Sequence, residues 1–233
     1  MRKILGLFFL LALAGSAHSQ VLISLLLGDK LNSEGLEFGL TGGFNWSTIS
    51  NMEADKSLST LNLGFYFDIR MKQQFWLHTG VLVKSRLGVA ELSTNDLNYL
   101  EASQYESGGD YNQSMNYFLV PVLAKYKFKN NFYIELGPQF GLAHKSWVEY
   151  IEKNDDVDAR IREYNKDQIN RIDAGIRGGV GYKLLKGTGM NIGLAYYYGF
   201  VDVYKTRSGT NNQSFFLVLD IPIGKSKKPD TGN

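Results

Sequence analysis

Apolar and polar side chains alternate over a long stretch near the end of the chain, residues 171–203. In residues 171–184 the even positions are almost all apolar, and the odd positions are charged residues or glycine. After a turn at residues 186–189, residues 190–203 repeat the alternation with aliphatic and aromatic side chains on one face. A period of two is typical of a strand with one apolar and one polar face. The stretch is therefore predicted to form a β-hairpin.

The length of the two arms distinguishes a membrane hairpin from a soluble one. Soluble strands usually span about 5–6 residues, and the arms 171–184 and 190–203 are much longer. They fit a tilted crossing of a bilayer, in which about 9–11 residues lie within the hydrocarbon. The apolar face then contacts lipid and the charged face lines a lumen. The alternative is a soluble, lipocalin-like barrel with its apolar face inside.

The rest of the chain repeats the same pattern. Six further alternating segments are residues 36–46, 59–71, 73–87, 115–128, 132–146 and 213–224. The connections between segments alternate between long and short: residues 47–58, 72, 88–114, 129–131, 147–168, 186–189 and 204–212. Outer-membrane barrels have short periplasmic turns and longer extracellular loops. The predicted fold is therefore all-β, a transmembrane antiparallel up-and-down β-barrel of eight strands over residues 36–224.

Two local features refine this prediction. Pro121 lies inside the segment 115–128 and has no backbone N–H to donate, so a bulge or local break is expected there. Residues 157–164, within the long connection 147–168, are compatible with a single helical turn.

The N-terminal residues have the pattern of an export signal. Met1-Arg2-Lys3 is followed by an apolar run from Ile4 to Ala14 and by small residues at Ala17 and Ser19. Residues 1–19 are predicted to be a cleaved signal peptide. Residues 20–35 are predicted to be a periplasmic segment, either an extended arm or a short helix, and residues 225–233 a loose periplasmic tail.

Composition narrows the class of protein. The chain has no cysteine, which excludes disulfides, thiol chemistry and a lipoprotein anchor. It has 25 Lys and Arg against 23 Asp and Glu, and the signal peptide carries two of the cations, so the exported chain is balanced and no nucleic-acid partner is expected. Aromatic residues near the strand ends suit interfacial girdles. These are Trp46, Phe75, Tyr126, Phe128, Phe132, Tyr182 and Phe200.

Charged residues occupy the predicted lumen face. The candidate lumen charge network is Asp68, Arg70, Lys84, Arg86, Glu135, Arg171, Asp173, Arg177 and Asp220, and Lys125, Lys127 and Lys183 share its face. Side chains fill the interior of an eight-stranded barrel, and buried charges require partners. The interpretation is a salt-bridged plug. The alternative is a narrow path that favours anions, because basic positions outnumber acidic ones.

The sequence offers little support for catalysis. His144 and Ser146 invite comparison with barrel acyltransferases, but His144 falls on the lipid-facing side of its strand and no acidic residue is placed to orient it. His78 lies on the lumen face without the clustered ligands that a metal requires, so it is interpreted as structural. The chain is predicted not to be an enzyme, and no cofactor or metal is expected.

The long loops are the predicted place of recognition. Residues 88–114 contain Tyr99, Tyr105 and Tyr111 among Asn and Ser, a composition typical of adaptable contact surfaces. The leading prediction is an integral outer-membrane scaffold with extracellular loops for binding. The expected partners are outer-membrane lipid and proteins that contact the loops or the periplasmic face.

Three stretches resemble the PorT-like outer-membrane β-barrel family: residues 25–39 leading into the first strand, residues 118–123 with the sequence FLVPVL, and residues 133–138 with the sequence YIELGP. The resemblance spans essentially the whole mature chain, although its motifs are strand patterns rather than catalytic signatures. It implies a protein of the outer membrane of a Gram-negative cell. The namesake of the family takes part in protein secretion, so the second hypothesis is an accessory component of an outer-membrane protein secretion system.

Overall fold

The computed structural model describes residues 35–223, except residues 55, 106–107, 153–158 and 188. The predicted signal peptide and C-terminal tail lie outside the described residues. The strands are β1 (Leu36–Ile49), β2 (Lys56–Lys72), β3 (Phe75–Ala90), β4 (Asp110–Lys127), β5 (Phe132–Glu152), β6 (Ala159–Tyr164), β7 (Ile172–Lys183), β8 (Asn191–Tyr204) and β9 (Arg207–Pro222). The helices are α2 (Thr94–Tyr99), the 3₁₀ helix η1 (Lys166–Gln168) and α3 (Leu184–Gly187). None of these helices is long and apolar enough to cross a membrane.

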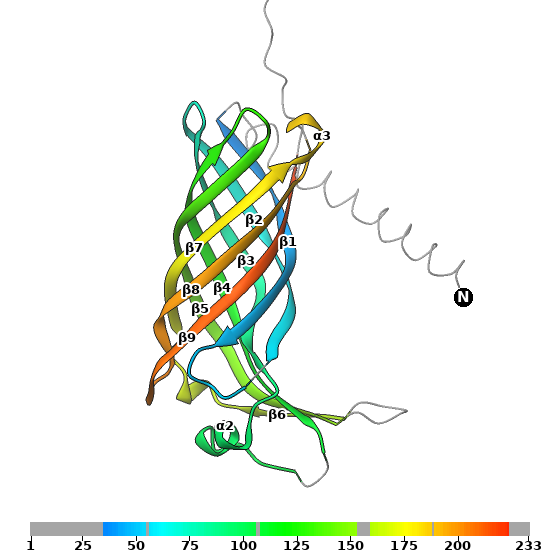
Figure 1. Cartoon of the computed structure of the whole chain (residues 1–233), viewed down its shortest axis with the longest axis vertical. Coiled ribbons are helices and arrows are strands. Elements are labelled where there is room, and N and C mark those ends of the chain that lie inside the picture. The colour runs from blue at the N-terminus through cyan, green and yellow to red at the C-terminus, as the bar shows by residue number, and fades with distance from the viewer. Residues whose placement is uncertain (1–34, 55, 106–107, 153–158, 188, 224–233) are drawn as a thin grey trace, which may run out of the picture.

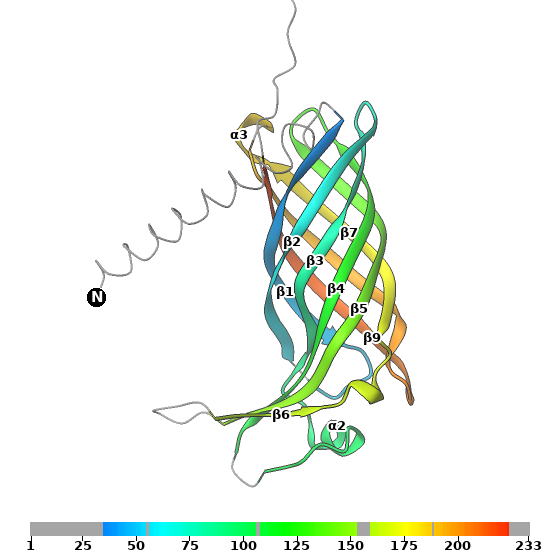
Figure 2. The ribbon, with the colours of Figure 1, turned by 180° about the vertical axis from the view of Figure 1, so that it is seen from behind.

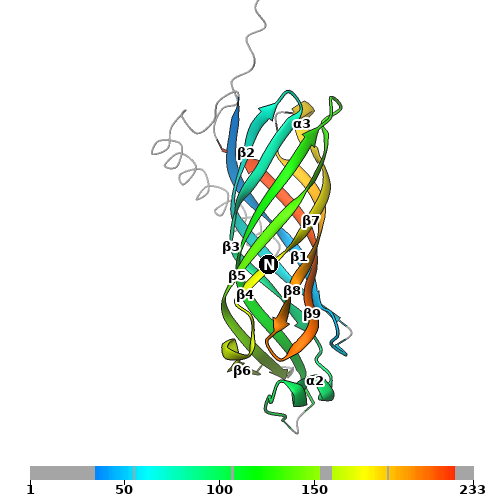
Figure 3. The same ribbon diagram turned by 90° about the vertical axis from the view of Figure 1, so that its left-hand side faces the viewer.

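Eight of the nine strands form a closed antiparallel ring. Successive strands pair from β1 to β5, β5 pairs with β7, and the ring continues through β8 to β9. Pairing of β9 with β1 closes it. Figures 1 and 3 show the tilted strands winding around one axis. The predicted up-and-down barrel is confirmed. The remaining strand, β6, pairs only with the far end of β5 and lies outside the ring.

The two ends of the barrel differ, as Figure 2 shows from behind. At one end, β2 joins β3 and β4 joins β5 through short turns, and α3 lies in the connection from β7 to β8. At the other end lie α2 and β6. By the loop rule for outer-membrane barrels, the α2 end is extracellular and the α3 end is periplasmic.

Close contact between backbones requires glycine where β1 meets β9. Gly43 adopts a φ of +139°, and a Cβ atom added there would lie 1.9 Å from the carbonyl oxygen of Leu217. Only glycine accommodates this backbone conformation without strain. The closing seam of the barrel therefore depends on Gly43.

The outward aromatic residues lie where the girdle prediction put them. At the periplasmic end, the rings of Phe75 and Tyr126 are 4.9 Å apart, as are those of Phe132 and Tyr182. Trp46 lies near the extracellular end of β1 and is 41% exposed. A band of exposed aliphatic side chains such as Leu136, Leu194 and Ile172 covers the outer wall. This arrangement is the lipid-facing surface expected of a membrane barrel.

Two predicted loop features are wrong. The connection after β8 consists only of residues 205–206, not 204–212, because β8 runs to Tyr204 and β9 begins at Arg207. Thr210 and Asn212, which were predicted to be in this loop, belong to β9 and are buried, so their polar side chains fill the interior of the barrel. The described part of the predicted helical turn, residues 159–164, is strand β6, which is paired with residues 147–152 of β5.

Bulges occur at positions other than Pro121. The pairing register is the same on both sides of Pro121, since Thr79 pairs with Val122 and Leu82 with Leu119. No bulge lies at Pro121, but neither Pro121 nor Val120 pairs with β3, so the other expectation, a local break in the ladder, is confirmed. Ser85 pairs with Tyr117, which places one extra residue in β3 between Leu82 and Ser85. A similar extra residue, His144, lies in β5. A bulge of one residue exchanges the two faces of the strand beyond it.

Candidate functional site: the filled lumen and the extracellular platform

Five of the nine predicted lumen charges are buried inside the barrel. These are Asp68, Glu135, Asp173, Arg177 and Asp220. They come from four strands, β2, β5, β7 and β9, and all lie on the inward face that the alternation defines. Because a buried charge without a partner is strongly destabilising, the important question is what each one contacts.

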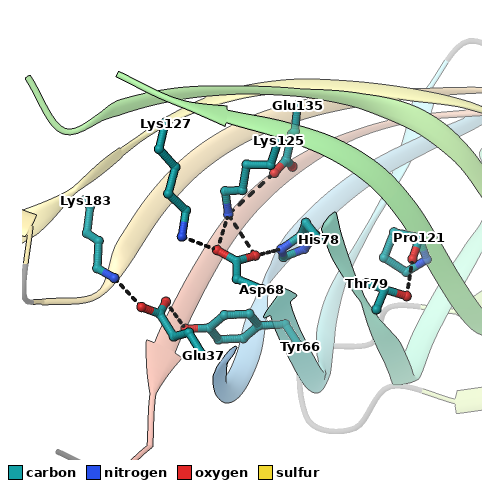
Figure 4. Close-up of polar contacts among 10 residues, drawn as sticks. All are labelled: Glu37, Tyr66, Asp68, His78, Thr79, Pro121, Lys125, Lys127, Glu135 and Lys183. Carbon is teal, nitrogen blue, oxygen red and sulfur yellow. Dashed lines mark hydrogen bonds and ion pairs between the residues drawn. The ribbon is translucent and has the colours of Figure 1, made fainter. Parts of the chain in front are cut away.

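Asp68 is the centre of one cluster, shown in Figure 4. One of its oxygens, Oδ1, lies 2.7 Å from Nδ1 of His78. The other, Oδ2, lies 2.7 Å from Nζ of Lys127 and 3.3 Å from Nζ of Lys125. Lys125 also lies 3.7 Å from Glu135. We call these five residues the Asp68 cluster.

The strand order explains why these residues meet. They lie on β2, β3, β4 and β5, which are consecutive neighbours in the ring. All are near the periplasmic ends of their strands. Aromatic rings complete the surroundings, since Nζ of Lys125 lies 4.1 Å from the ring centroid of Tyr133 and Nζ of Lys127 lies 3.8 Å from that of Trp76. Such cation–π contacts stabilise desolvated ammonium groups.

A second polar group lies beside the Asp68 cluster. Glu37 of β1 forms an ion pair with Lys183 of β7 and accepts a hydrogen bond of 2.9 Å from the Tyr66 hydroxyl. Figure 4 shows this group and the Asp68 cluster extending across the interior. Together they place ion pairs between strands that are not neighbours in the ring, β2 with β4 and β1 with β7.

The remainder of the interior is more apolar than the sequence analysis expected. Arg177 donates a 3.0 Å hydrogen bond to Gln139, and Asp173 accepts one of 3.0 Å from Asn212. Around these polar groups, large side chains are fully buried: Leu87, Met115, Tyr117, Leu119, Leu123, Tyr197 and Phe216. A cavity of about 20 Å³ lies beside Tyr66 and His78, which is room for about one water molecule. Side chains thus fill the lumen.

The other four predicted network residues do not lie in the lumen. Lys84 is exposed on the outer wall and Arg86 is half-buried there, because the bulge in β3 exchanges the faces. For the same reason Leu87, which was predicted to face lipid, is fully buried. Arg70 is exposed near the periplasmic mouth, 6.0 Å from the ring of Trp76. Arg171 is exposed just before β7 begins.

His144 and Ser146 do not form a catalytic pair. His144 is on the outer wall, stacked on Phe118 with ring centroids 4.8 Å apart. Ser146 is fully buried, and its hydroxyl donates a 2.6 Å hydrogen bond to Asn165. The two side chains therefore lie on opposite faces of β5. Among the described residues, no three His, Cys, Asp or Glu side chains are grouped so that they could hold a metal ion.

The extracellular connections form one packed structure, which we call the extracellular platform. It comprises residues 50–54, 91–105, 159–171 and 205–206, the end of β5 that pairs with β6, and the end of β4 that pairs with this end of β5. Its centre is α2, which begins with a capping box: Ser93 accepts a hydrogen bond from the N–H of Asp96, and Asp96 accepts one from the N–H of Ser93. Helix α2 was not predicted, although its signal is present in the sequence: Ser93 stands three residues before the acidic residue Asp96.

Each of the other three extracellular connections is tied to α2 or its flanking residues. From the first, Glu53 accepts hydrogen bonds of 2.9 and 3.1 Å from Asn95. From the third, the side-chain amide of Gln168 donates to the carbonyl of Leu100 at 3.1 Å. From the last, Arg207 lies 3.6 Å from Asp96, and Thr206 lies 2.9 Å from the Tyr99 hydroxyl.

An apolar core under the platform joins it to the barrel. Leu92, Leu97 and Leu100 are at most 7% exposed and belong to the same buried cluster as Ile49 and Tyr204 of the barrel strands. Above this core, Tyr105, Ile161 and Tyr164 remain exposed. The platform is therefore a fixed surface with aromatic and aliphatic groups on its outside.

A closed antiparallel membrane barrel with one elaborated end defines the class of outer-membrane β-barrel proteins. The family model described as an outer membrane protein beta-barrel domain matches residues 28–205. The chain belongs to this family, which places it in the outer membrane.

Several solved structures resemble the chain at low sequence identity. Ail, the attachment invasion locus protein of Yersinia pestis, is 11% identical; the match covers 82% of this chain and 99% of Ail, with a TM-score of 0.45. Neisserial surface protein A (NspA) is 10% identical over 81% of this chain and 99% of NspA, with a TM-score of 0.43. OprG from Pseudomonas aeruginosa is 13% identical over 82% and 95%, with a TM-score of 0.34. No curated protein matches the sequence.

Proposed function

We propose that the protein is a non-catalytic surface receptor or adhesion scaffold, in which the barrel holds the extracellular platform in the outer membrane for binding. The observation that carries this proposal is that all four extracellular connections are joined into one structure around α2. Contacts from Glu53, Gln168 and Arg207 limit the freedom of these connections. A surface that is ordered before binding loses less entropy when its partner arrives.

The filled lumen supports a scaffold rather than a pore. The Asp68 cluster occupies the periplasmic half of the interior, and residues such as Tyr117 and Phe216 fill the rest. Passage of an ion would require several of these contacts to break. Exposed Tyr164, Tyr105 and Ile161 give the platform the aromatic and aliphatic anchors that are common in binding surfaces.

A binding screen tests this proposal. The folded protein, in lipid nanodiscs, is presented to a panel of extracellular proteins and surface polysaccharides beside the variant Ile161→Ser/Tyr164→Ser. The control is Lys129→Gln, which alters an exposed residue of the periplasmic turn. A partner that binds the wild type and the control should lose about tenfold or more in affinity for the platform variant, since two anchors are removed. Binding that survives in the platform variant would contradict the proposal.

The resemblance to PorT-like barrels supports a second function, an accessory role in protein secretion. This role would act through the periplasmic face or the membrane wall instead of the platform. It predicts that deleting the gene reduces the export of other proteins, and that Ile161→Ser/Tyr164→Ser restores export as well as the wild type does. Normal export in the deletion strain would rule this function out.

A further inference from the structure

The outer wall of the barrel carries cations where a lipid-facing surface should be apolar. Lys84 and Lys145 are exposed on the outward faces of β3 and β5, and Arg86 and His144 are half-buried beside them. Each bulge puts two consecutive residues on the outside, Val83 with Lys84 and His144 with Lys145. The bulges thus place positive charge on the lipid side of the wall.

The membrane tolerates these residues because of their position along the strands relative to the hydrocarbon layer. Phe75 and Phe132 begin β3 and β5 at the periplasmic end, and about 9–11 residues of a tilted strand cross the hydrocarbon. Lys84 and Lys145 therefore lie at or just beyond its outer limit. A lipid-facing Lys or Arg is destabilising by about 2–4 kcal/mol at the bilayer midplane, but by only about 0–1 kcal/mol near the interfaces. The cations lie at the level of the outer-leaflet headgroups.

The wall is hollowed at this level. A hollow of about 460 Å³ is lined by Lys84, Arg86, Asn116 and His144 together with residues 59–61 of β2. We call it the cationic hollow. It lies where the ladder between β2 and β3 is interrupted, between the pairs Ser57–Val89 and Leu63–Lys84.

Side chains replace the missing backbone contacts at the interruption. The carbonyl of Arg86 accepts hydrogen bonds from Thr60, at 2.8 Å, and from Asn45, at 3.0 Å. The N–H of Gly88 donates to the Ser47 hydroxyl at 3.0 Å. Unpaired backbone groups are normally excluded from lipid. These side-chain hydrogen bonds give partners to backbone groups that the interrupted ladder leaves unpaired, so the interruption is part of the stable fold.

Arg86 is held in a fixed orientation. Its Nε donates a 3.2 Å hydrogen bond to Asn116, and its guanidinium lies 4.9 Å from the ring centroid of Trp147. Arg162 lies 5.1 Å from the same ring and is paired with Glu149 at 2.6 Å. Neither Arg86 nor Lys84 forms an ion pair with a carboxylate among the residues that the structure describes. A fixed guanidinium beside an unpaired ammonium suits a phosphate, which a guanidinium binds through two hydrogen bonds.

We propose that the cationic hollow binds the phosphate group of a phosphorylated glycolipid of the outer leaflet. Lys84 and Arg86 contact the phosphate, and the polar rim of the hollow contacts the sugar. Leu61 and Val83 also line the hollow, Phe118 lies opposite Val83 and Lys84 on β4, and all three are exposed on the outer wall. These apolar residues suit the acyl chains of the same molecule, which favours a membrane lipid over a soluble anion.

Native mass spectrometry of the folded protein in detergent micelles tests this proposal. The probes are phosphorylated lipid A and the same lipid after enzymatic removal of its phosphates. The test variant is Lys84→Gln/Arg86→Gln. The matched control is Lys72→Gln/Lys129→Gln, which removes two exposed cations at the periplasmic end. Each variant must show the same change in gel mobility on boiling as the wild type, which verifies that the barrel has folded.

Wild type and control are expected to retain the phosphorylated lipid in preference to the dephosphorylated one. The test variant should retain the phosphorylated lipid at least about tenfold more weakly than the wild type, as expected when charge-assisted hydrogen bonds to a phosphate are lost. If Lys84→Gln/Arg86→Gln fails to fold, the exposed single change Lys84→Gln should still weaken retention. Equal retention by wild type and variants would overturn the proposal. Displacement of the lipid by millimolar inorganic phosphate would also overturn it, because it would identify a site for free anions.

Discussion

Removing the carboxylate of Asp68 should destabilise the barrel more than any other single change in the lumen. Asp68 and Lys125 are both 0% exposed in their side chains, and Lys127 is 21% exposed. Asp68→Ala would leave Lys125 with Glu135 alone, at 3.7 Å, and Lys127 without a carboxylate. Breaking a buried ion pair by removing one partner typically costs about 3–5 kcal/mol. The free energy of unfolding should fall by roughly that amount.

The measurement is urea unfolding in phospholipid vesicles, followed by the fluorescence of the tryptophans. Asp167→Ala, an exposed aspartate on the extracellular side, is the control and should change stability by no more than about 0.5 kcal/mol. The double variant Asp68→Ala/Lys125→Met should lose less than the sum of its single changes, because it removes a buried cation together with its partner. A loss below about 1 kcal/mol for Asp68→Ala would refute the assignment of Asp68 as the centre of the lumen contacts.

Three further changes test other parts of the structure. Gly43→Ala should prevent closure of the barrel and reduce the heat-modifiable band on gels, whereas Gly108→Ala should not, because an added Cβ meets nothing within 4 Å at Gly108. Ser93→Ala removes the cap of α2 and should cost about 1 kcal/mol, seen as faster hydrogen exchange in residues 94–100 with no change in the barrel. Ser146→Ala should weaken the contact with Asn165 but leave the lipid profile of the cell unchanged; an altered profile would revive a catalytic role.

Strand alternation was sufficient to predict the barrel because the membrane imposes one rule on every strand. An outward position must be apolar, whereas an inward one need not be. The hairpin from 171 to 203 could therefore be identified from its own alternation, without knowing which strands pair with it. The same rule put Asp68, Glu135 and Arg177 in the lumen. It could not show that His78, Lys125 and Lys127 all contact one carboxylate, because that depends on the stagger between neighbouring strands.

The rule failed where one inserted residue changed the face. Nothing in the stretch from Val83 to Leu87 marks the bulge, since Lys84 and Arg86 fit the inward parity and Leu87 fits the outward one. The exchange is visible only in the pairing of β3 with its neighbours β2 and β4. Lys84 and Arg86, which line the cationic hollow, were therefore predicted to belong to the lumen charge network.

The extracellular end was the hardest part to predict. Polar residues of β9 such as Thr210 and Asn212 face the interior, so the sequence around the last connection has no apolar alternation to mark a strand. Likewise, β6 is held by pairing with the end of β5 rather than by an apolar face. The platform depends on contacts between connections that are distant in sequence.

The central claim is that the barrel spans the outer membrane with the platform on the cell surface, and cysteine labelling tests it most directly. The chain has no native cysteine, so single cysteines can be placed at two exposed positions, Asn98→Cys on α2 and Lys129→Cys in the turn between β4 and β5. In intact cells, a membrane-impermeant maleimide should label Asn98→Cys and should label Lys129→Cys only after the outer membrane is permeabilised. Labelling of Lys129→Cys but not Asn98→Cys in intact cells would contradict the orientation. Labelling of both only after permeabilisation would contradict the placement of the platform on the cell surface.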